Sequence, residues 1–333
     1  MRLCGLCVKP RGRSITKTAT VTANRKLKRP SPIQLTLPAT SANLGPAFDA
    51  AALAFSMFLK VRAKSANEFS VAAGGRDADI CGRVENHLIL TTYREVLQSE
   101  NRPVLPLALR IDNGIPIGKG CGSSAAARLA GIALAVHFGG LQWSDERIIG
   151  EAAQREHHPD NAAACWMGGL AVARMSDGQA QTISVTPRAK WPLLLALPAQ
   201  SLPTEEARRV LPEQYSRADL VTNLQNSMLL LAAFTQGRRD LLGGALADRI
   251  HQPYRSRLCP LLPVLQELAG SAGILGVALS GAGPSVLMFV DPKAKLSESK
   301  RRVREQLRIH DLNAELIEAE ITTRGAGKSR RRG

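Results

Sequence analysis

The stretch Pro116-Ile-Gly-Lys-Gly-Cys-Gly-Ser-Ser-Ala125 places three alternating glycines directly before two serines and an alanine-rich segment. Glycine lets the backbone adopt positive φ angles and approach a ligand closely. The free N–H groups of the helix predicted over 124–138, reinforced by its dipole, would form an anion site. Ser123 and Ser124 can cap this helix, and one hydroxyl can reach a phosphate or its Mg²⁺. The stretch therefore predicts a phosphate-binding loop.

Two well-known phosphate loops do not fit this stretch. Lys119 is followed by Gly rather than by Ser or Thr, which excludes a Walker A motif. Gly118, Gly120 and Gly122 lack the spacing of a dinucleotide-binding loop at the first strand of a fold. An ordinary glycine-rich turn before a serine-capped helix is the plain alternative.

Length and charge restrict the class of protein. A chain of 333 residues, 44% of them hydrophobic, usually divides into two domains of roughly 150 residues. No apolar run approaches the roughly 20 residues that span a bilayer. The net charge is +16, but residues 1–32 hold nine Lys and Arg and residues 324–333 hold five, with no acid in either segment. The remaining body is almost neutral, so no broad nucleic-acid-binding face is expected.

The two basic ends are predicted to lie outside the folded domains. Residues 1–32 show no apolar periodicity, and we interpret them as a disordered extension. A transit peptide or sequence upstream of the true start are the alternatives, and residues 324–333 are expected to be a second disordered tail. The six scattered cysteines favour free thiols in a reducing compartment.

Periodicity predicts an α+β fold with an N-terminal domain at 33–188 and a C-terminal domain at 189–323. Strands are expected at 33–37, 53–62, 69–72, 104–111, 170–174, 181–186, 191–197, on both sides of 280–284, and at 314–322. Helices are expected at 86–98, 124–138, 144–155, 159–167, 218–234, 261–271 and 296–307. Strand, glycine loop and helix over 104–138 form the central unit.

Three further segments concentrate polar residues in apolar surroundings: Thr40-Ser-Ala-Asn-Leu-Gly-Pro-Ala-Phe-Asp49, Glu156-His-His-Pro-Asp-Asn161 and Leu279-Ser-Gly-Ala-Gly-Pro-Ser-Val286. Taken singly, they could be a turn, a helix cap and a hairpin connection. Together with the glycine loop, their order and spacing resemble the motifs of the GHMP kinases, and in particular of the homoserine kinase family. The resemblance extends from residue 33 to residue 322.

The resemblance implies a two-domain fold, with an N-terminal domain like domain 2 of ribosomal protein S5 and a ferredoxin-like C-terminal α/β sandwich. It implies an ATP-dependent, Mg²⁺-dependent phosphotransferase that acts on the hydroxyl of L-homoserine in threonine biosynthesis. It also implies a cytoplasmic homodimer. Other GHMP kinases that act on mevalonate, shikimate, sugars or threonine are alternatives, as is a non-catalytic nucleic-acid-binding protein on the same fold.

The family's substrate roles fall on seven residues of this sequence: Asn43, Asp49, His158, Asp160, Asn161, Arg208 and Arg255. Asn43 and Asp49 would bind the amino group. Arg208 in Pro203-Thr-Glu-Glu-Ala-Arg208 and Arg255 in His251-Gln-Pro-Tyr-Arg255 would bind the carboxylate, because a planar guanidinium meets a carboxylate with two parallel hydrogen bonds.

The nucleotide roles carried over are Asn86 for adenine and Pro116, Gly118, Lys119, Gly120, Cys121, Gly122, Ser123, Ser124 and Thr204 for the phosphates. Ser124 and Glu156 would hold the metal, with Glu151 as the alternative carboxylate. Asp160, Asn161 and Lys119 would serve catalysis, which in phosphoryl transfer consists mainly of positioning and charge neutralisation.

Four positions depart from the family's pattern: Ala47, His87, Cys121 and Ser285. Ala47 stands where the family usually has glycine. A methyl group there is unfavourable if the backbone needs a positive φ, so Ala47 bears on the identity of the substrate more than on the fold.

Overall fold

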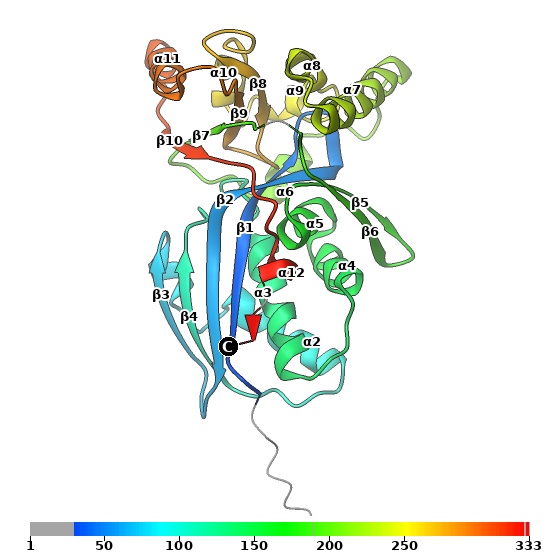
Figure 1. The fold of residues 1–333 in the computed structure, drawn as a ribbon, viewed down its shortest axis with the longest axis vertical. Coiled ribbons are helices and arrows are strands. Elements are labelled where there is room, and N and C mark those ends of the chain that lie inside the picture. The colour runs from blue at the N-terminus through cyan, green and yellow to red at the C-terminus, as the bar shows by residue number, and fades with distance from the viewer. Residues whose placement is uncertain (1–29, 189, 330, 333) are drawn as a thin grey trace, which may run out of the picture.

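The structure, a computed structural model, describes residues 30–188, 190–329 and 331–332. Two domains of mixed helix and strand lie end to end along the long axis of the molecule (Figure 1). Strands β1 (Ile33–Asn43) and β2 (Ala47–Ser65) run along the N-terminal domain and reach the junction with the C-terminal domain. The expected two-domain α+β architecture is confirmed.

The N-terminal domain is built on a seven-stranded sheet. Its main path has the order β11-β1-β2-β4-β3, in which β3 and β4 are parallel, and the antiparallel hairpin of β5 and β6 joins through β2. These strands are β3 (Ser70–Gly75), β4 (Leu107–Asn113), β5 (Leu170–Ser176), β6 (Gln179–Val185) and β11 (Arg331–Arg332). The long β1–β2 pair carries its connecting turn to the C-terminal domain, where the Asn43 side chain donates to the Gly281 carbonyl.

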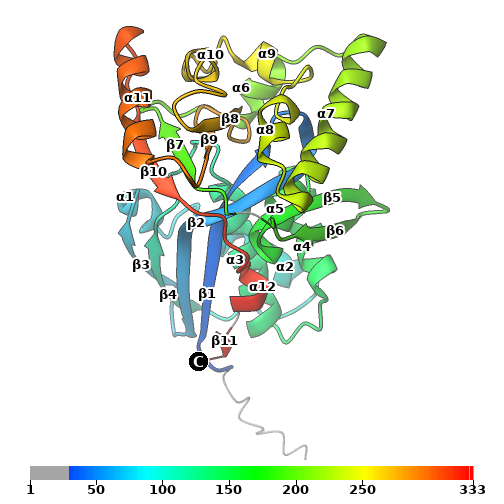
Figure 2. The ribbon, with the colours of Figure 1, turned by 45° about the horizontal axis from the view of Figure 1, so that its top comes forward.

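Helices cover one face of this sheet (Figures 1 and 2). They are α2 (Leu88–Ser99), α3 (Ser123–Phe138), α4 (Asp145–Glu156) and α5 (Asp160–Met167), while the short α1 (Ala78–Cys81) lies beside β3. Helix α3 is apolar on nearly every side and is buried, as expected for a central core helix. Gly131 permits its close contact with α2, because a Cβ there would lie 2.6 Å from the Ile89 carbonyl oxygen.

The C-terminal domain contains an antiparallel four-stranded sheet in the order β10-β7-β9-β8. Its strands are β7 (Leu193–Leu197), β8 (Ile274–Leu279), β9 (Val286–Val290) and β10 (Glu315–Ala319). Its helices are α6 (Thr204–Arg209), α7 (Arg217–Gln236), α8 (Arg239–Ala245), α9 (Gln252–Arg255), α10 (Leu261–Gln266) and α11 (Leu296–Ile309). Every residue of β7 and β9 is buried, which accounts for their uninterrupted apolar sequences.

The end of the chain returns to the N-terminal domain. Residues after β10 bond to β2, where Ser56 N–H donates to Glu320 O at 2.9 Å and Thr322 N–H donates to Ala54 O at 3.0 Å. Helix α12 (Ala326–Ser329) follows, and Ala326 is fully buried. The disordered tail expected at 324–333 is therefore wrong for residues 326–329, which form a helix. The domain boundary expected at 323 is also wrong, because the chain has already returned to β2 before that residue. The prediction rested on the basic composition of this segment, which does not reveal that its small residues pack against Trp166.

The other expected helices and strands are present, and they differ from the observed ones only at their ends. The helix expected over 261–271 ends at Gln266, and the short helices α1, α6, α8 and α9 were not predicted, because helices of four to seven residues carry little periodic signal. The boundary expected near 188 lies in the connection between β6 and β7. Residues 1–29 of the expected extension lie outside the described residues. Among the helices described, none is long and apolar enough to cross a membrane.

Candidate active site

A cleft of about 700 Å³ lies at the junction of the two domains. Its walls come from the β1–β2 connection, the glycine loop, the N-terminus of α5, helices α6 and α9, and the β8–β9 connection. The predicted residues that line it are Asn43, Asp49, Asn86, Gly118, Gly120, Gly122, Ser123, Ser124, Glu156, His158, Asp160, Asn161, Thr204, Arg208 and Arg255. The fold thus brings together most of the residues selected from the sequence.

The glycine loop needs its glycines for two physical reasons. Gly118, Gly120 and Gly122 have φ angles of +69°, +74° and +71°, which residues with a Cβ rarely adopt. A Cβ on Gly122 would also lie 1.9 Å from Thr40 Oγ1, and one on Gly120 would lie 2.1 Å from the Ser280 carbonyl oxygen. The loop is therefore packed between β1 and the β8–β9 connection.

Helix α3 begins directly after this loop, and its N-terminus faces the cleft. Gly122 is its N-cap and no side chain caps it, so the expectation that Ser123 or Ser124 caps the helix is wrong. Both serines lie in the first turn instead, beside backbone N–H groups that an anion can use. The Ser124 hydroxyl donates to Glu156 Oε1 at 2.6 Å.

Glu156, the expected metal ligand, lies beside Ser124 at the cleft. Its Oε1 accepts from Ser124 and, at 2.6 Å, from Arg128 Nε. Hydroxyl and carboxylate oxygens are the donors that Mg²⁺ prefers, so this pair fits that ion. The alternative, Glu151, forms an ion pair with Arg155 and does not line the cleft.

Asp160 presents a buried carboxylate at the start of α5. Its Oδ1 accepts from His158 Nδ1 at 2.7 Å and from the Asn161 N–H at 2.6 Å. Its Oδ2 is buried and has no hydrogen-bond partner among the residues that the structure describes. Burial lowers the pKa of His158, but the hydrogen bond and charge of Asp160, with more distant Asp49 and Glu156, raise it above its usual value. Asp160 therefore brings to the lining of the cleft a carboxylate with one unsatisfied oxygen.

Asp49 and Arg208 form a bidentate ion pair across the two domains. Arg208 Nη1 donates to Asp49 Oδ2 at 3.0 Å and Nη2 donates to Oδ1 at 2.8 Å. Both side chains are about one-third exposed. Asn43 Oδ1 accepts from the Asp49 N–H at 3.0 Å, so the turn holds the carboxylate in place. The pair offers one positive and one negative charge to a ligand.

Arg255 is a deeply buried cation of the cleft, with a relative exposure of 1%. Among the described residues no carboxylate lies within 4.0 Å of its guanidinium group. Burial, followed by repulsion from Arg208, lowers the pKa of Arg255 to about 10. A buried cation without an acidic partner is a favourable place for the carboxylate of a ligand.

Three predicted phosphate-binding residues do not line the cleft. Lys119 contacts the Ala199 carbonyl oxygen and, with Pro116, faces a neighbouring cavity of about 370 Å³. Gly118 and Gly120 face the cleft, so Lys119 between them projects from the opposite side of the loop. Cys121 is buried, and burial raises the pKa of its thiol to about 12. The position of Lys119 gives no support to its expected role in charge neutralisation.

Sequence reasoning missed residues that hold the selected ones in place. Thr40 Oγ1 donates to Asn161 Oδ1 at 2.7 Å, and Arg128 fixes Glu156. Arg128 lies four residues after Ser124 on α3, so the i to i+4 spacing could have indicated it. Ala47 does not have a positive φ, so the concern raised by its methyl group does not apply.

The comparisons with known proteins agree with this arrangement. The model of the GHMP kinases N terminal domain matches residues 87–169, and that of the GHMP kinases C terminal domain matches residues 230–309. A homoserine kinase from Solibacter usitatus is 40% identical over 293 residues, which cover 87% of this chain and 95% of the relative. A homoserine kinase from Deinococcus radiodurans is 33% identical, and the match covers 88% of this chain and 96% of the relative.

Solved structures share the fold. A homoserine kinase from Cytophaga hutchinsonii superposes with a TM-score of 0.74 at 22% identity, covering 90% of this chain and 98% of that one. The L. major mevalonate kinase superposes with a TM-score of 0.67 at 15% identity, covering 90% and 99%. These two likenesses concern the fold alone. The identity to the curated relatives over nearly their whole length, together with both domain matches, shows that the chain belongs to the homoserine kinase family of the GHMP kinases.

Proposed function

We propose that this protein transfers the γ-phosphoryl group of ATP to the side-chain hydroxyl of L-homoserine, giving O-phospho-L-homoserine for threonine biosynthesis. The observation that carries the proposal is the charge arrangement in the cleft. Arg255 and Arg208 suit a carboxylate, and Asp49 suits an ammonium group. Mevalonate and shikimate offer a carboxylate without an ammonium group, and galactose offers neither. An amino acid complements both charges.

Asp160 would orient the substrate hydroxyl. Asp160 lines the same cleft, and its Oδ2 has no hydrogen-bond partner among the described residues, so this oxygen would accept a hydrogen bond from the hydroxyl. The hydroxyl oxygen then bonds to the γ-phosphorus, the bond from that phosphorus to the β-phosphate oxygen breaks, and ADP leaves with the electron pair. The hydroxyl proton moves towards Asp160. His158 and the Asn161 N–H hold the other oxygen and so fix the direction of Oδ2.

The nucleotide would lie with its phosphates against the glycine loop and the first turn of α3. Asn86, together with apolar Ile80 and Leu88, lines the part of the cleft assigned to adenine. Ser124 and Glu156 would hold Mg²⁺, which neutralises phosphate charge when bound. Because Lys119 faces away, backbone N–H groups would supply much of the protein's contribution to charge neutralisation.

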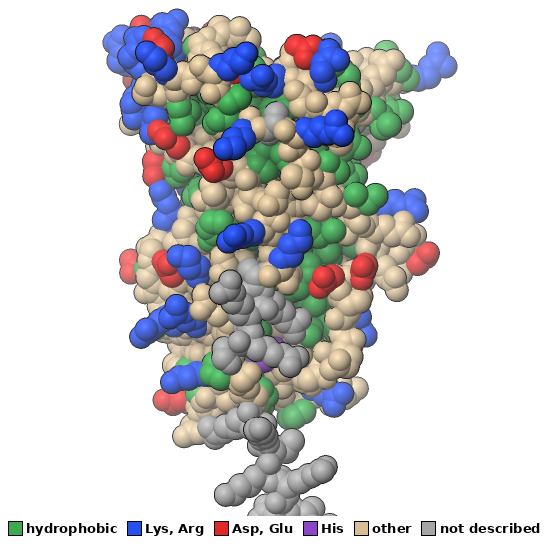
Figure 3. Space-filling view, viewed as in Figure 1, with side chains coloured by type: hydrophobic (Ala, Val, Ile, Leu, Met, Phe, Trp, Pro, Cys, Tyr) green, Lys and Arg blue, Asp and Glu red, His purple; other side chains and the backbone are tan. Residues whose placement is uncertain are grey.

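The family expectation of a cytoplasmic homodimer is kept as part of this proposal. In support, α7 exposes Leu220, Leu224 and Met228 on successive turns, an apolar face that a second copy could cover. Light scattering should then give twice the chain mass of 35.7 kDa. No nucleic-acid partner is proposed: on the face in Figure 3, Lys and Arg are interspersed with Asp and Glu, apart from a cluster at α11.

The test is ADP release by the full chain with Mg-ATP and a panel of alcohols. The panel contains L-homoserine, L-threonine, shikimate, mevalonate and galactose. Preferential turnover of L-homoserine, abolished by EDTA and restored by Mg²⁺, is expected. Preference for another alcohol would retain the kinase and overturn the pocket assignment. An absence of turnover with all five, together with salt-dependent DNA binding, would favour the nucleic-acid-binding alternative.

A further inference from the structure

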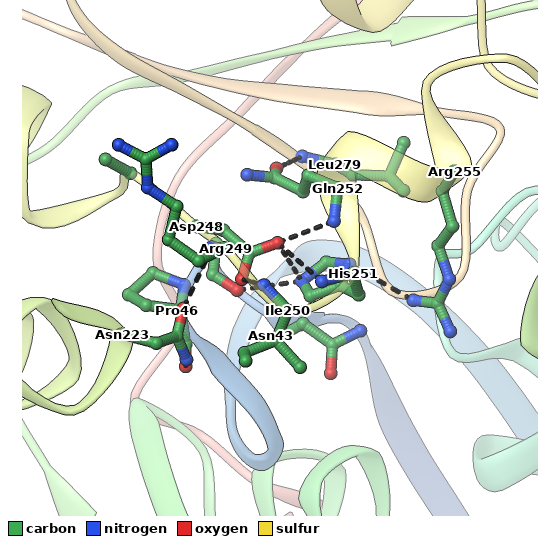
Figure 4. Close-up of polar contacts among 12 residues, drawn as sticks. Asn43, Pro46, Asn223, Asp248, Arg249, Ile250, His251, Gln252, Arg255 and Leu279 are labelled. Carbon is green, nitrogen blue, oxygen red and sulfur yellow. Dashed lines mark hydrogen bonds and ion pairs between the residues drawn. The ribbon is translucent and has the colours of Figure 1, made fainter. Parts of the chain in front are cut away.

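His251 is a buried side chain that the proposed reaction does not itself use. It directly precedes α9, and its relative exposure is 0%. Its Nδ1 accepts from Arg255 Nη1 at 3.2 Å (Figure 4). Its Nε2–H donates to the Gly45 carbonyl oxygen at 2.8 Å. The ring therefore connects the β1–β2 turn of the N-terminal domain to an arginine of the C-terminal domain.

These two contacts define the state of the imidazole ring. A guanidinium group only donates hydrogen bonds, so Nδ1 must be unprotonated and the ring proton must be on Nε2. Burial lowers the pKa of His251 to about 4, and the charge of Arg255 acts in the same direction, while those of Asp248 and Asp49 oppose it. The ring is therefore neutral near pH 7, and both hydrogen bonds can persist.

The ring is itself held from several sides. The Asp248 carboxylate accepts hydrogen bonds from the backbone N–H groups of Ile250, His251 and Gln252. Its Oδ2 also lies 3.5 Å from His251 Nε2. Phe48 stacks on the ring, with centroids 5.3 Å apart and an interplanar angle of 27°. His251 therefore has little freedom to rotate, which is what a residue that orients its neighbour requires.

On the other side, Arg255 depends on a few neutral acceptors. Its Nε donates to Ala207 O at 2.9 Å, and its Nη1 donates to His251 and, at 3.4 Å, to Gly281 O. Gly45 lies between Asn43 and Asp49, the residues assigned to the amino group. The imidazole ring thus links Arg255, assigned to the carboxylate, to the segment assigned to the amino group, and so sets the distance between them.

We propose, on the basis of the proposed function, that His251 is a positioning residue that directs the Arg255 guanidinium at the substrate carboxylate and couples it to segment 43–49, which binds the ammonium group. In this role His251 determines specificity. It favours α-amino acids over amino alcohols that lack the carboxylate.

The test compares L-homoserine with 3-aminopropan-1-ol, which keeps the ammonium and hydroxyl groups but has no carboxylate. In His251→Leu, kcat/KM for L-homoserine should fall about 10-fold to 100-fold, mainly through KM. The KM for ATP, and kcat/KM for the amino alcohol, should change by less than about threefold. His251→Asn should recover most of the loss, because its Oδ1 can accept from Arg255. Val303→Ala is the control: it destabilises the C-terminal core without touching the cleft.

An equal loss for both substrates in His251→Leu, or an unchanged KM for L-homoserine, would overturn the proposal. A crystal structure of His251→Leu gives a readout independent of turnover. The Arg255 guanidinium should leave the Gly281 carbonyl oxygen, and an unmoved guanidinium would also overturn the proposal. If the unmodified protein phosphorylates neither substrate, the proposed function fails, while the crystal structure still decides the role of His251.

Discussion

The Asp160 oxygen that has no hydrogen-bond partner within the described part of the chain is the most informative single atom of the site. A buried carboxylate oxygen without a hydrogen bond is unfavourable in the free protein, so its retention indicates a use in the complex. Phosphoryl transfer depends more on alignment than on strong base catalysis. If Asp160 acts as proposed, mainly by orienting the hydroxyl, its removal should slow the reaction without abolishing it.

Asp160→Asn should lower kcat by about a hundredfold to a thousandfold, with a smaller effect on the KM for L-homoserine. The amide keeps the size of the side chain but replaces one acceptor oxygen by a donor. Steady-state kinetics, with a thermal melt to show that the variant is folded, provide the measurement. A loss in kcat of less than threefold would remove Asp160 from the reacting centre.

Arg208→Ala should act on binding instead. We expect the KM for L-homoserine to rise about 10-fold to 100-fold with a small change in kcat, because the guanidinium binds the ground state and the transition state alike. Arg209→Ala, next to it on α6 and well exposed, is the matched control and should leave both constants unchanged. A large fall in kcat with the KM unchanged would count against a carboxylate role for Arg208.

At the scale of elements, the glycine loop and α3 act as one unit. The loop has positive φ at alternate residues because β1 and the β8–β9 connection approach it closely on both sides. Its rigidity aligns the first-turn N–H groups of α3 before the nucleotide arrives, which favours binding through preorganisation.

Gly122→Ala tests this unit against a matched glycine. Gly140 also has a positive φ, but a Cβ there meets nothing within 4 Å, so Gly140→Ala should lose only about 1 kcal/mol of unfolding free energy. Gly122→Ala should lose at least about 2 kcal/mol more and weaken ATP binding, because its Cβ would overlap Thr40 Oγ1. Urea unfolding and nucleotide titration measure the two effects. Equal losses in the two variants would show that the loop has room to relax.

At the scale of the whole molecule, the C-terminal segment joins the two domains by returning to β2 and α5. Ala326→Asp should reduce the unfolding free energy by about 3 kcal/mol or more, because it places a charge in a fully buried position. Lys328→Asp, on the same short helix but exposed, should change it by less than about 0.5 kcal/mol. Urea denaturation distinguishes the two, and an equal effect would show that α12 does not contribute to the core.

Acid should weaken the folded protein through His251. The pKa of His251 is lowered to about 4 in the folded state, against about 6.5 when unfolded. Between these values the unfolded chain binds the proton and the folded chain does not, so this contribution is complete above pH 6.5 and is lost as the pH falls towards 4. The free energy of unfolding, measured by urea denaturation, should fall less steeply from pH 7 to pH 4 in His251→Asn than in the unmodified protein. Identical slopes would contradict the lowered pKa.

The local elements follow directly from the sequence. Alternation predicts β1, an apolar segment predicts α3 and the stretch 116–125 predicts the loop between strand and helix, because these patterns depend on neighbours within a few residues. The four motifs also identify the family, since their residue types and order are specific. Glycine's lack of a Cβ likewise shows from the sequence that Gly118, Gly120 and Gly122 can adopt the positive φ that the structure has there.

The tertiary structure alone decides which of these residues meet. Asp49 and Arg208 are 159 residues apart, and no local pattern predicts their ion pair. The same holds for the outward direction of Lys119, the hydrogen bond between Ser124 and Glu156 and the return of α12 to the N-terminal domain. His251 appeared in the sequence as one letter of a motif, and its position between Gly45 and Arg255 gives it a role. Such contacts depend on how the two sheets pack, a property of the whole chain that short-range preferences do not encode.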